Sequence, residues 1–320
     1  MELSEIAKYL VNPPKGILAA DESATTCCKR FASVQLPCEE EDRRKYRELL
    51  ITTQNTENYL TGIIMVDETL RQKDSSGKLF TEILKEKGIL SGIKVDLGLE
   101  DFGTNGEQIT KGLDGLDARL AEYASLGAKF AKWRAVFSAE SGFPTDELVH
   151  KANSIMVEYA SLCQKNNIVP IMEPEILMDG VHKAQDVKMT LEKILKDLFQ
   201  KCRDSGIEIE GVILKTAMVE SNKDDTNSTT PAEVATWTVD ALRNTVPENI
   251  GGVVYLSGGM QSDEAIENFK AIMAKGQDLP FKMTFSFSRA IQNPVLEEYA
   301  KGNIEKAKEN YLERLQKLSK

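Results

Sequence analysis

Residues 211–219 read GVILKTAMV, a short apolar stretch rich in β-branched residues with a lysine, Lys215, near its middle. Its length and its polar or glycine flanks predict a buried β-strand. Lysine is rarely buried in a strand unless it is paired or has a chemical task. Burial disfavours the ammonium form, and a neutral lysine amine is a nucleophile that condenses with a carbonyl to give a Schiff base. Lys215 is therefore the first candidate functional residue.

Further strand-length stretches of this kind recur along the whole chain. The eight begin at Gly16, Gly62, Ser91, Ala128, Val169, Glu210, Gly251 and Lys282. Successive starts are between 29 residues (Gly62 to Ser91) and 46 residues (Gly16 to Gly62) apart. Because a strand–helix–strand unit takes about 30 residues or more, each interval has room for a helix. The pattern predicts an α/β fold, a single (β/α)8 TIM barrel made by residues 1–320 as one domain. A doubly wound open sheet is the alternative, although it more often has a glycine-rich turn after the first strand, and GxGxxG is absent.

The intervals between the strands show the helical period. Apolar residues three and four apart in 148–163 and in 187–202 predict helices that bury one face. A third helix is predicted to start after Thr230, which can act as its N-cap, with Pro231 at the first helical position. The polar residues 220–229 before it are predicted to form a loop at the barrel mouth, either a plain solvated loop or a functional one.

The overall composition indicates an ordinary globular protein, with 41% hydrophobic and 28% charged residues. No apolar stretch reaches the roughly 18 residues that suggest a membrane span. The first ten residues, MELSEIAKYL, lack the basic and apolar regions of a signal peptide. The formal net charge of −10 argues against a nucleic-acid surface, which would be basic. We therefore expect a cytoplasmic protein that binds neither nucleic acid nor a membrane.

The cysteines and histidines indicate neither disulfides nor a metal site. The five cysteines are Cys27, Cys28, Cys38, Cys163 and Cys202. Their odd number and the absence of a CxxC motif predict reduced thiols in the cytoplasm. Only two histidines occur, His150 in a predicted helix and His182 in a polar turn, whereas a zinc enzyme usually supplies three or four His or Cys ligands. Both histidines are expected at the surface or in hydrogen bonds, and no metal is expected.

Charged residues gather at the carboxyl ends of the predicted strands, where the active residues of such barrels lie. They are Asp21, Glu22, Lys94, Asp96, Lys132, Arg134, Glu173, Glu175, Lys215 and Arg289. Several are two residues apart and so share one face of a strand. Because helices cover the outer face of a barrel, these side chains are expected to point into its mouth.

The strand positions suggest roles for the charged groups nearest to Lys215. Alternate strands contribute to one interior layer of a barrel, so Lys132 and Arg289 are expected near Lys215. Neighbouring cations favour a neutral, nucleophilic lysine amine. Glu173 and Glu175 can exchange protons, and a crowded carboxylate can have a raised pKa and act as a general acid. Asp21 is a third carboxylate that could act as a base.

The remaining cations predict an anionic substrate. Lys94, Arg134 and Arg289 are not needed for Schiff-base chemistry, and they suit phosphate. Residues 257–259 read SGG and offer backbone N–H groups to an anion, supported by Ser288 and Arg289 after the eighth strand. Phosphate sites in these barrels often use the loops after strands seven and eight. Lys94 with Arg134 indicates a second phosphate.

Seven segments closely resemble class I fructose-1,6-bisphosphate aldolases. They are GILAADES (16–23), GIKVD (92–96), FAKWRAV (130–136), VPIMEPEILMDG (169–180), GVILKTAMV (211–219), YLSGG (255–259) and TFSFSRA (284–290). They span nearly the whole chain, and TNGEQITKGLDGLDAR (104–119) adds further similarity. The resemblance implies a metal-independent lyase of glycolysis and gluconeogenesis with no cofactor. It would reversibly cleave the sugar bisphosphate fructose 1,6-bisphosphate to glycerone phosphate and D-glyceraldehyde 3-phosphate.

The resemblance also implies roles for the central residues. Lys215 would form the Schiff base. Asp21 would serve the proton transfer at the hydroxyl whose deprotonation drives C–C cleavage. Glu173 would act as acid and base on the carbinolamine, and Glu175 and Lys132 would tune that centre.

Two phosphate sites are implied in the same way. One would consist of Ser257, Gly258 and Arg289, next to Ser288. The other would consist of Ser23, Thr26, Lys94 and Arg134, with Lys29 and Arg30 lining the entrance.

The chain departs from the family pattern at several positions. Thr216 and Ala217 stand where Pro-Asn is common, Ser288 stands where glycine is usual, and Met260 is inserted after the SGG segment. Animal-type members continue past the last helix in a flexible tail that ends in tyrosine and assists proton exchange on the enamine, whereas residues 318–320 read LSK. The resemblance thus leaves open the proton route and the preference among fructose 1,6-bisphosphate, fructose 1-phosphate and related ketoses.

Two other functional hypotheses remain compatible with the sequence. One is a different Schiff-base barrel that acts on a monophosphate or on another sugar bisphosphate. The other is a binding protein, since members of the family also associate with cytoskeletal filaments. The family suggests a homotetramer.

Overall fold

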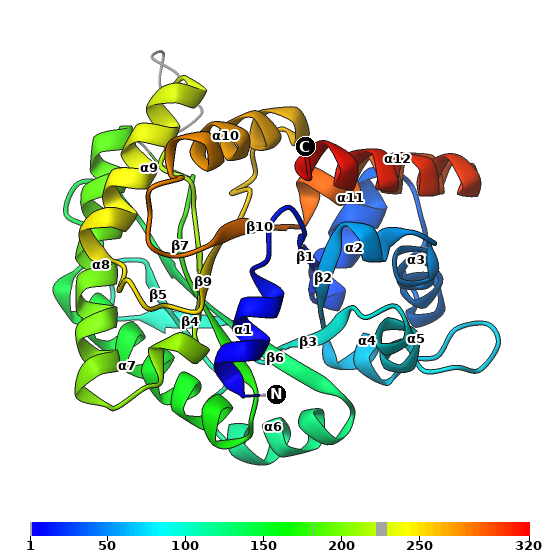
Figure 1. Ribbon diagram of the computed structural model, residues 1–320, viewed down its shortest axis with the longest axis horizontal. Helices are drawn as coiled ribbons and strands as arrows, with labels where there is room; N and C mark the ends of the chain where they lie inside the picture. Colours follow the sequence, from blue (N-terminus) through cyan, green and yellow to red (C-terminus); the bar gives the residue numbers. More distant parts are fainter. Residues whose placement is uncertain (1, 181, 222–228) are drawn as a thin grey trace.

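The computed structural model describes residues 2–180, 182–221 and 229–320, and within them eight parallel strands close into a barrel (Figure 1). The strands are β1 (Gly16–Ala19), β2 (Leu60–Met65), β3 (Leu90–Lys94), β6 (Ala128–Phe137), β7 (Val169–Ile176), β8 (Ile213–Thr216), β9 (Gly252–Tyr255) and β10 (Met283–Phe287). Their order around the barrel is β1-β10-β9-β8-β7-β6-β3-β2. Closure is made by Ile17, which pairs with Gly62 on one side and with Ser286 on the other. The predicted TIM barrel is confirmed, and the open sheet is excluded.

Helices surround the barrel, with α7–α10 on one side and α2–α5, α11 and α12 on the other (Figure 1). They are α1 (Leu3–Leu10), α2 (Ala24–Ser33), α3 (Glu40–Thr52), α4 (Asp67–Arg71), α5 (Phe80–Glu86), α6 (Leu116–Ser125), α7 (Asp146–Lys165), α8 (Ala184–Asp204), α9 (Pro231–Thr245), α10 (Ser262–Lys275), α11 (Arg289–Ala300) and α12 (Ile304–Leu318), with short 3₁₀ helices η1 (Thr56–Asn58) and η2 (Ile209–Gly211). The helices predicted from 148–163 and 187–202 are α7 and α8, and the Thr230 hydroxyl accepts a hydrogen bond from Glu233 N at the start of α9, as predicted. The first interval contains two helices, α2 and α3, and the second contains the two short helices α4 and α5.

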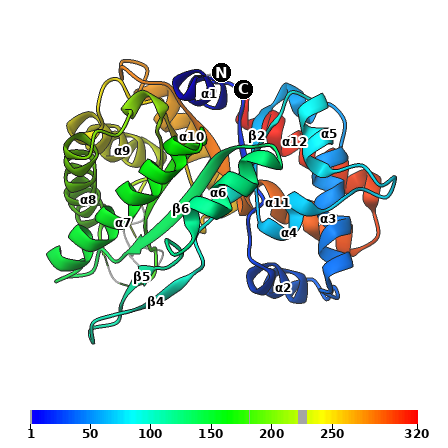
Figure 2. The ribbon, with the colours of Figure 1, turned by 90° about the horizontal axis from the view of Figure 1, so that it is seen from below.

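An antiparallel hairpin, β4 (Leu99–Phe102) and β5 (Glu107–Thr110), follows β3 and extends away from the barrel (Figure 2). The sequence did not predict it, because both strands are short and β4 has no buried residue that would mark a strand. Tertiary contacts hold the hairpin in place. The buried Glu107 carboxylate accepts hydrogen bonds from Thr145 N at 2.8 Å and Thr145 Oγ1 at 2.7 Å, at the start of α7.

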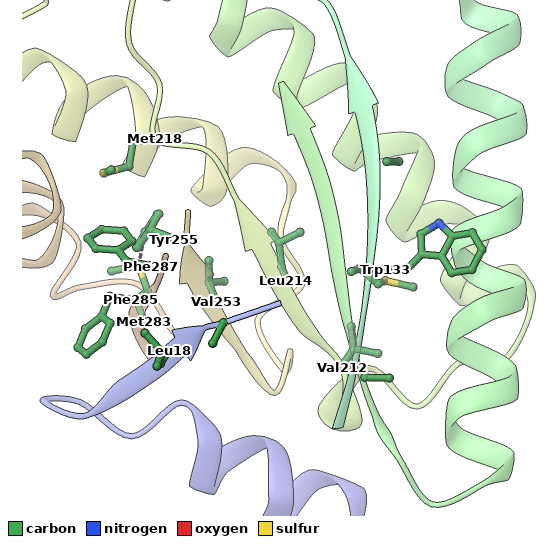
Figure 3. Packing of buried hydrophobic residues seen from close by; sticks show 14 of the residues in the cluster. Leu18, Trp133, Val212, Leu214, Met218, Val253, Tyr255, Met283, Phe285 and Phe287 are labelled. Atoms are coloured by element: carbon green, nitrogen blue, oxygen red, sulfur yellow. Dashed lines mark hydrogen bonds between the residues drawn. The ribbon is translucent and has the colours of Figure 1, made fainter. Parts of the chain in front are cut away.

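The apolar core has two parts that leave the carboxyl ends of the strands free for polar groups. An outer layer packs between strands and helices and includes Leu18, Trp133 and Phe285 (Figure 3). An inner cluster combines residues inside the barrel, such as Phe130 and Ile213, with the apolar face of α1, which thereby closes the amino-terminal end. Within the described ranges, no helix is both long and apolar enough to cross a membrane.

The expectation that all five cysteines are reduced thiols is wrong. Cys28 of α2 and Cys38 ahead of α3 form a disulfide, with Cα atoms 5.3 Å apart, whereas Cys27, Cys163 and Cys202 are free and buried. No local motif signals this bond, because the turn after α2 brings the two cysteines together. His150 is exposed and lies 2.9 Å from Lys201 Nζ, as expected of a surface residue.

His182 differs from the expectation for either histidine. It is 3% exposed, and neither ring nitrogen has a hydrogen-bond partner among the residues that the structure describes. Burial lowers its pKa, because a charged imidazolium is disfavoured away from water. The imidazole of His182 is therefore turned away from solvent. Most of the predicted mouth loop at 220–229 lies outside the described residues.

Candidate active site

A cavity of about 1230 Å³ opens at the carboxyl ends of the barrel strands. Every residue assigned to the site from the sequence lines it: Asp21, Ser23, Thr26, Lys29, Arg30, Lys94, Lys132, Arg134, Glu173, Glu175, Lys215, Ser257, Gly258, Ser288 and Arg289. The strands explain this convergence. In β6 and β7 the charged side chains are two residues apart and alternate with outward-facing apolar ones, so both members of each pair point into the cavity.

A buried chain of alternating charges lies at the base of this cavity. Lys215 Nζ lies 2.8 Å from Glu173 Oε1, and Lys132 Nζ lies 2.9 Å from Glu173 Oε2. Lys132 Nζ also lies 2.7 Å from Asp21 Oδ2. The four side chains come from β8, β7, β6 and the end of β1, and each residue is at most 9% exposed. Two ammonium groups thus balance two carboxylates, which is the pairing that buried charges require.

The neighbouring charges shift the pKa values of Glu173, Asp21 and Lys132 toward their ionised forms. Burial raises the pKa of Glu173, but the Lys132 and Lys215 ammonium groups outweigh it and lower that pKa below its ordinary value. The pKa of Asp21 is lowered for the same reason, against the effect of burial. Burial lowers the pKa of Lys132, yet the Asp21 and Glu173 carboxylates raise it above the usual range. The raised carboxylate pKa expected at Glu173 is therefore wrong, because the neighbours are cations rather than other carboxylates.

This charge state indicates the direction of the first proton transfer. At neutral pH Glu173 is a carboxylate in contact with the Lys215 amine nitrogen, so it is poised to accept a proton from Lys215. Once protonated, it becomes a carboxylic acid at the base of the cavity and can return that proton. In this arrangement Glu173 can serve first as a base and then as an acid.

Cations predicted to bind phosphate fall into two groups. Lys94 and Arg134 already have carboxylate partners, since Lys94 Nζ lies 2.5 Å from Asp96 Oδ1 and Arg134 forms an ion pair with Glu175. Arg289, by contrast, is exposed and forms no ion pair within the described residues, and the same is true of Lys29.

The loop after β9 is shaped around Arg289. Gly258 and Gly259 have φ angles of 52° and 90°, in the region that favours glycine. A Cβ atom on Gly259 would lie 3.1 Å from Arg289 Nη2. The absence of a side chain therefore lets the guanidinium lie against the loop. Ser257, Gly258 and Arg289 all line the cavity.

Comparison with known proteins places the chain in a family. Residues 2–320 match the sequence model of the family described as fructose-bisphosphate aldolase class-I. The chain belongs to this family. Its members are lyases, so the expected activity, that of a class I fructose-bisphosphate aldolase, is confirmed at the level of the family.

Several relatives align with nearly the whole aldolase chain. Cytosolic fructose-bisphosphate aldolase 4 of Arabidopsis thaliana is 43% identical over 316 residues, which cover 98% of this chain and 80% of the relative. A probable class 1 aldolase of Xanthomonas axonopodis pv. citri is 42% identical over 98% of this chain and 95% of its own. A structure of Plasmodium falciparum aldolase, in a ternary complex with TRAP and a small-molecule inhibitor, superposes with a TM-score of 0.96 at 42% identity, and the match covers 99% of this chain and 92% of that one.

Sequence reasoning assigned no role to Glu22, the carboxylate that organises one edge of the aldolase cavity. Glu22 Oε1 accepts hydrogen bonds from Ser288 Oγ at 2.7 Å and Gln292 Nε2 at 2.9 Å, and it pairs with Arg30. Glu22 Oε2 accepts a hydrogen bond from Arg47 Nη1 at 2.8 Å. Arg47 lies in the ordinary charged helix α3, and its burial is visible only in the fold.

Thr216 and Met260, two positions where the sequence was expected to depart from the family pattern, are both buried. Thr216 is fully buried at the end of β8, and its hydroxyl donates to Ala217 O at 3.3 Å. Met260 is 5% exposed, and its sulfur accepts a hydrogen bond from Asn268 Nδ2 at 3.7 Å. Met260 therefore packs inward, while Ser257 and Gly258 line the cavity.

Proposed function

We propose that Lys215 is the nucleophile of this aldolase and that it forms a Schiff base with the C2 carbonyl of fructose 1,6-bisphosphate. The observation that carries the proposal is the 2.8 Å contact between Lys215 Nζ and Glu173 Oε1, inside a cavity rimmed by cations. A buried lysine next to a carboxylate that can take its proton has the arrangement that amine nucleophiles need. Lys132 keeps the adjacent carboxylates ionised until the reaction begins.

Schiff-base formation uses Glu173 in both directions. Glu173 removes a proton from the Lys215 ammonium, and the neutral amine adds to the ketose carbonyl to give a carbinolamine. Protonated Glu173 then returns the proton to the carbinolamine hydroxyl, which leaves as water and yields the iminium ion. Glu175, which is paired with Arg134 two residues along the strand, tunes the field at this centre.

Cleavage of the carbon–carbon bond uses Asp21. The Asp21 carboxylate accepts the proton of the C4 hydroxyl, the C3–C4 bond breaks, and its electron pair moves into the iminium to give an enamine. Glyceraldehyde 3-phosphate leaves as the aldehyde. Protonation of the enamine and hydrolysis of the resulting iminium release glycerone phosphate and free Lys215. The ion pair with Lys132, at 2.7 Å, holds Asp21 in place for this step.

The two substrate phosphates would bind to two separate groups of residues that line the cavity. Ser257, Gly258 and Arg289 would form the first site, and Arg289, which has no ion-pair partner among the described residues, would supply its charge. Ser23, Thr26, Lys94 and Arg134 form the second site, and Lys29 and Arg30 line its entrance. Because Lys94 and Arg134 are paired with Asp96 and Glu175, phosphate would have to share or displace these carboxylates. We therefore expect the first site to hold its phosphate more tightly than the second.

Borohydride trapping tests the central assignment. Reduction in the presence of fructose 1,6-bisphosphate should fix a covalent adduct on Lys215, located by peptide mapping. Lys215→Met should give neither adduct nor cleavage, while Lys165→Met, which removes an exposed lysine of α7, should retain both. An adduct found on another lysine, or none in active enzyme, would refute the proposal.

We also propose that the protein works in the cytoplasm as a homotetramer. Cytosolic relatives and the net charge of −10 support the location, and light scattering of the purified protein measures the assembly. Filament association is a separate proposal. A relative with the same fold is seen with the partner protein TRAP, which supports a binding role on this scaffold. Co-sedimentation of Lys215→Met with filaments separates binding from catalysis, because this variant should bind as wild type does while being inactive.

A further inference from the structure

Glu22 lies next in sequence to Asp21 but faces a different set of partners. Asp21 turns toward Lys132 inside the barrel, whereas Glu22 turns toward α2, α3 and α11. The Glu22 side chain is 10% exposed. Burial raises its pKa, but Arg47 and Arg30 outweigh burial and lower it, so the group is a carboxylate at neutral pH. Its position therefore depends on cation and hydroxyl partners from three separate helices.

The partners of Glu22 divide by location. Arg47 and Gln292 are buried behind it, at 3% and 0% exposure. Gln292 Nε2 also donates to Ala19 O at 2.8 Å, which anchors the group to the end of β1. Arg30 and Ser288, in contrast, line the cavity. The carboxylate thus connects a rigid interior to two groups on the rim of the substrate site.

Ser288 places this network beside Arg289. The Ser288 hydroxyl donates a hydrogen bond to Glu22 Oε1, which Gln292 and Arg30 also contact. Arg289 is the next residue, and within the described part of the chain it pairs with no carboxylate. The Glu22 carboxylate offers about four acceptor positions, and Ser288, Gln292 and Arg30 contact Oε1 while Arg47 contacts Oε2. The Ser288 contact therefore ties the start of α11, where Arg289 lies, to this carboxylate.

We propose that Glu22 is a positioning residue for anion binding: it holds Arg30 and Ser288 at the cavity rim and, through the hydrogen bond from Ser288, fixes the start of α11 so that Arg289 is in place for a phosphate. This inference rests on the proposed function, in which the cavity binds a phosphorylated ketose. Ser288 would then act on substrate through Glu22 rather than by direct contact.

The Ser288 hydroxyl can be tested without disturbing the buried arginine. Ser288→Ala removes the donor to Glu22, and since a hydrogen bond to a charged group contributes about 1.5 kcal/mol, KM for fructose 1,6-bisphosphate should rise roughly tenfold to fifteenfold. The effect should fall on KM more than on kcat, because the hydrogen bond to Glu22 organises the rim before substrate binds. The inhibition constant of inorganic phosphate should rise by the same factor. Ser288→Thr keeps the hydroxyl and should restore both constants.

A double-mutant cycle with Glu22→Gln distinguishes whether Ser288 acts through Glu22 or contacts the substrate directly. If Ser288 acts through Glu22, then Ser288→Ala should change KM by less than about twofold in the Glu22→Gln background, since the charge it restrains is gone. An equal rise in both backgrounds would mean that the hydroxyl contacts the substrate directly and would overturn the proposal. An unchanged KM in Ser288→Ala alone would overturn it as well.

Glu22→Gln could fail to fold, because Arg47 would lose its buried partner. The proposal can be tested in that case as well. In that case the Ser288 series decides: a raised KM in Ser288→Ala with recovery in Ser288→Thr supports the proposal, and any other pattern overturns it. Borohydride trapping on Lys215 in Ser288→Ala at saturating substrate reports on the proposed function separately. An adduct with an unchanged KM refutes only the Glu22 inference, whereas a wild-type enzyme without an adduct refutes the Schiff-base assignment.

Discussion

Lys132 Nζ lies between two carboxylates, 2.7 Å from Asp21 Oδ2 and 2.9 Å from Glu173 Oε2. This lysine is 3% exposed and connects the end of β1 to β7 across the mouth of the barrel. Because it pairs with both carboxylates assigned to proton transfer, its charge sets their ionisation. We therefore expect the stability of the fold and the chemistry of the site to depend on the same residue.

Removal of the Lys132 charge should destabilise the protein. Lys132→Met leaves Asp21 and Glu173 buried with one fewer cation, and breaking a buried pair in this way costs about 3–5 kcal/mol. Equilibrium urea unfolding measures the change. Lys165→Met is the matched control, since Lys165 forms an exposed pair with Asp117 and should leave the unfolding midpoint nearly unchanged. A similar midpoint for both variants would contradict the buried network.

The lowered pKa of Asp21 and Glu173 predicts how stability depends on pH. A carboxyl whose pKa is lower in the folded state stabilises the fold above its unfolded pKa of about 4, and this contribution is lost as pH falls toward the folded value. The free energy of unfolding should therefore fall steeply below about pH 4. In Asp21→Asn the free energy of unfolding should fall less steeply with decreasing pH. The slope should differ from that of wild type by up to about 1.4 kcal/mol per pH unit, the effect of one proton. Asp101→Asn, at an exposed position of β4, should show the same pH dependence of unfolding as wild type. Equal slopes for wild type and both variants would refute the lowered pKa of Asp21.

Arg134 should distinguish a bisphosphate from a monophosphate substrate. Arg134→Ala removes a cation from the second phosphate site, so kcat/KM for fructose 1,6-bisphosphate should fall roughly tenfold to a hundredfold, the usual effect of a charge-assisted hydrogen bond. The value for fructose 1-phosphate should change much less, because that substrate lacks the second phosphate. Steady-state kinetics with both ketoses provides the comparison, and Arg134→Lys should recover part of the loss. Equal losses for both substrates would place Arg134 elsewhere in the reaction.

The disulfide between Cys28 and Cys38 should add stability around α2. The bridge spans a sequence separation of 10 residues, and closing a loop of that size in the unfolded chain contributes about 2–3 kcal/mol. Cys38→Ser and wild type in dithiothreitol should therefore unfold at the same, lower urea concentration. Dithiothreitol should not shift the midpoint of Cys38→Ser any further. If the reductant leaves the wild-type midpoint unchanged, the bridge does not contribute.

Much of the barrel and of the site could be predicted because the signals are local. A strand such as Val169–Ile176 is recognisable from a few consecutive residues, and the two-residue spacing of Glu173 and Glu175 places both on one face. Lys215 stood out because charge inside an apolar strand is costly without a partner. The convergence of these residues on one cavity follows from the barrel, whose strand ends meet on one side.

Other features depended on pairs that no local pattern encodes. Which cations are paired was not predictable: Arg134 contacts Glu175, whereas Arg289 remains without a carboxylate among the described residues. The lowered pKa of Glu173 and the disulfide of Cys28 also escaped prediction.

The barrel, the position of Lys215 and the family could thus be inferred from the amino-acid sequence alone. Each of these depends on short-range periodicity or on motifs of a few residues. The partners of Glu22 became apparent only in the folded chain, because they come from α2, α3 and α11 and lie up to 270 positions along the chain from it. Electrostatic and hydrogen-bond energies fall off over a few ångströms, so such pairings exist only once barrel closure has brought the two ends of the chain together.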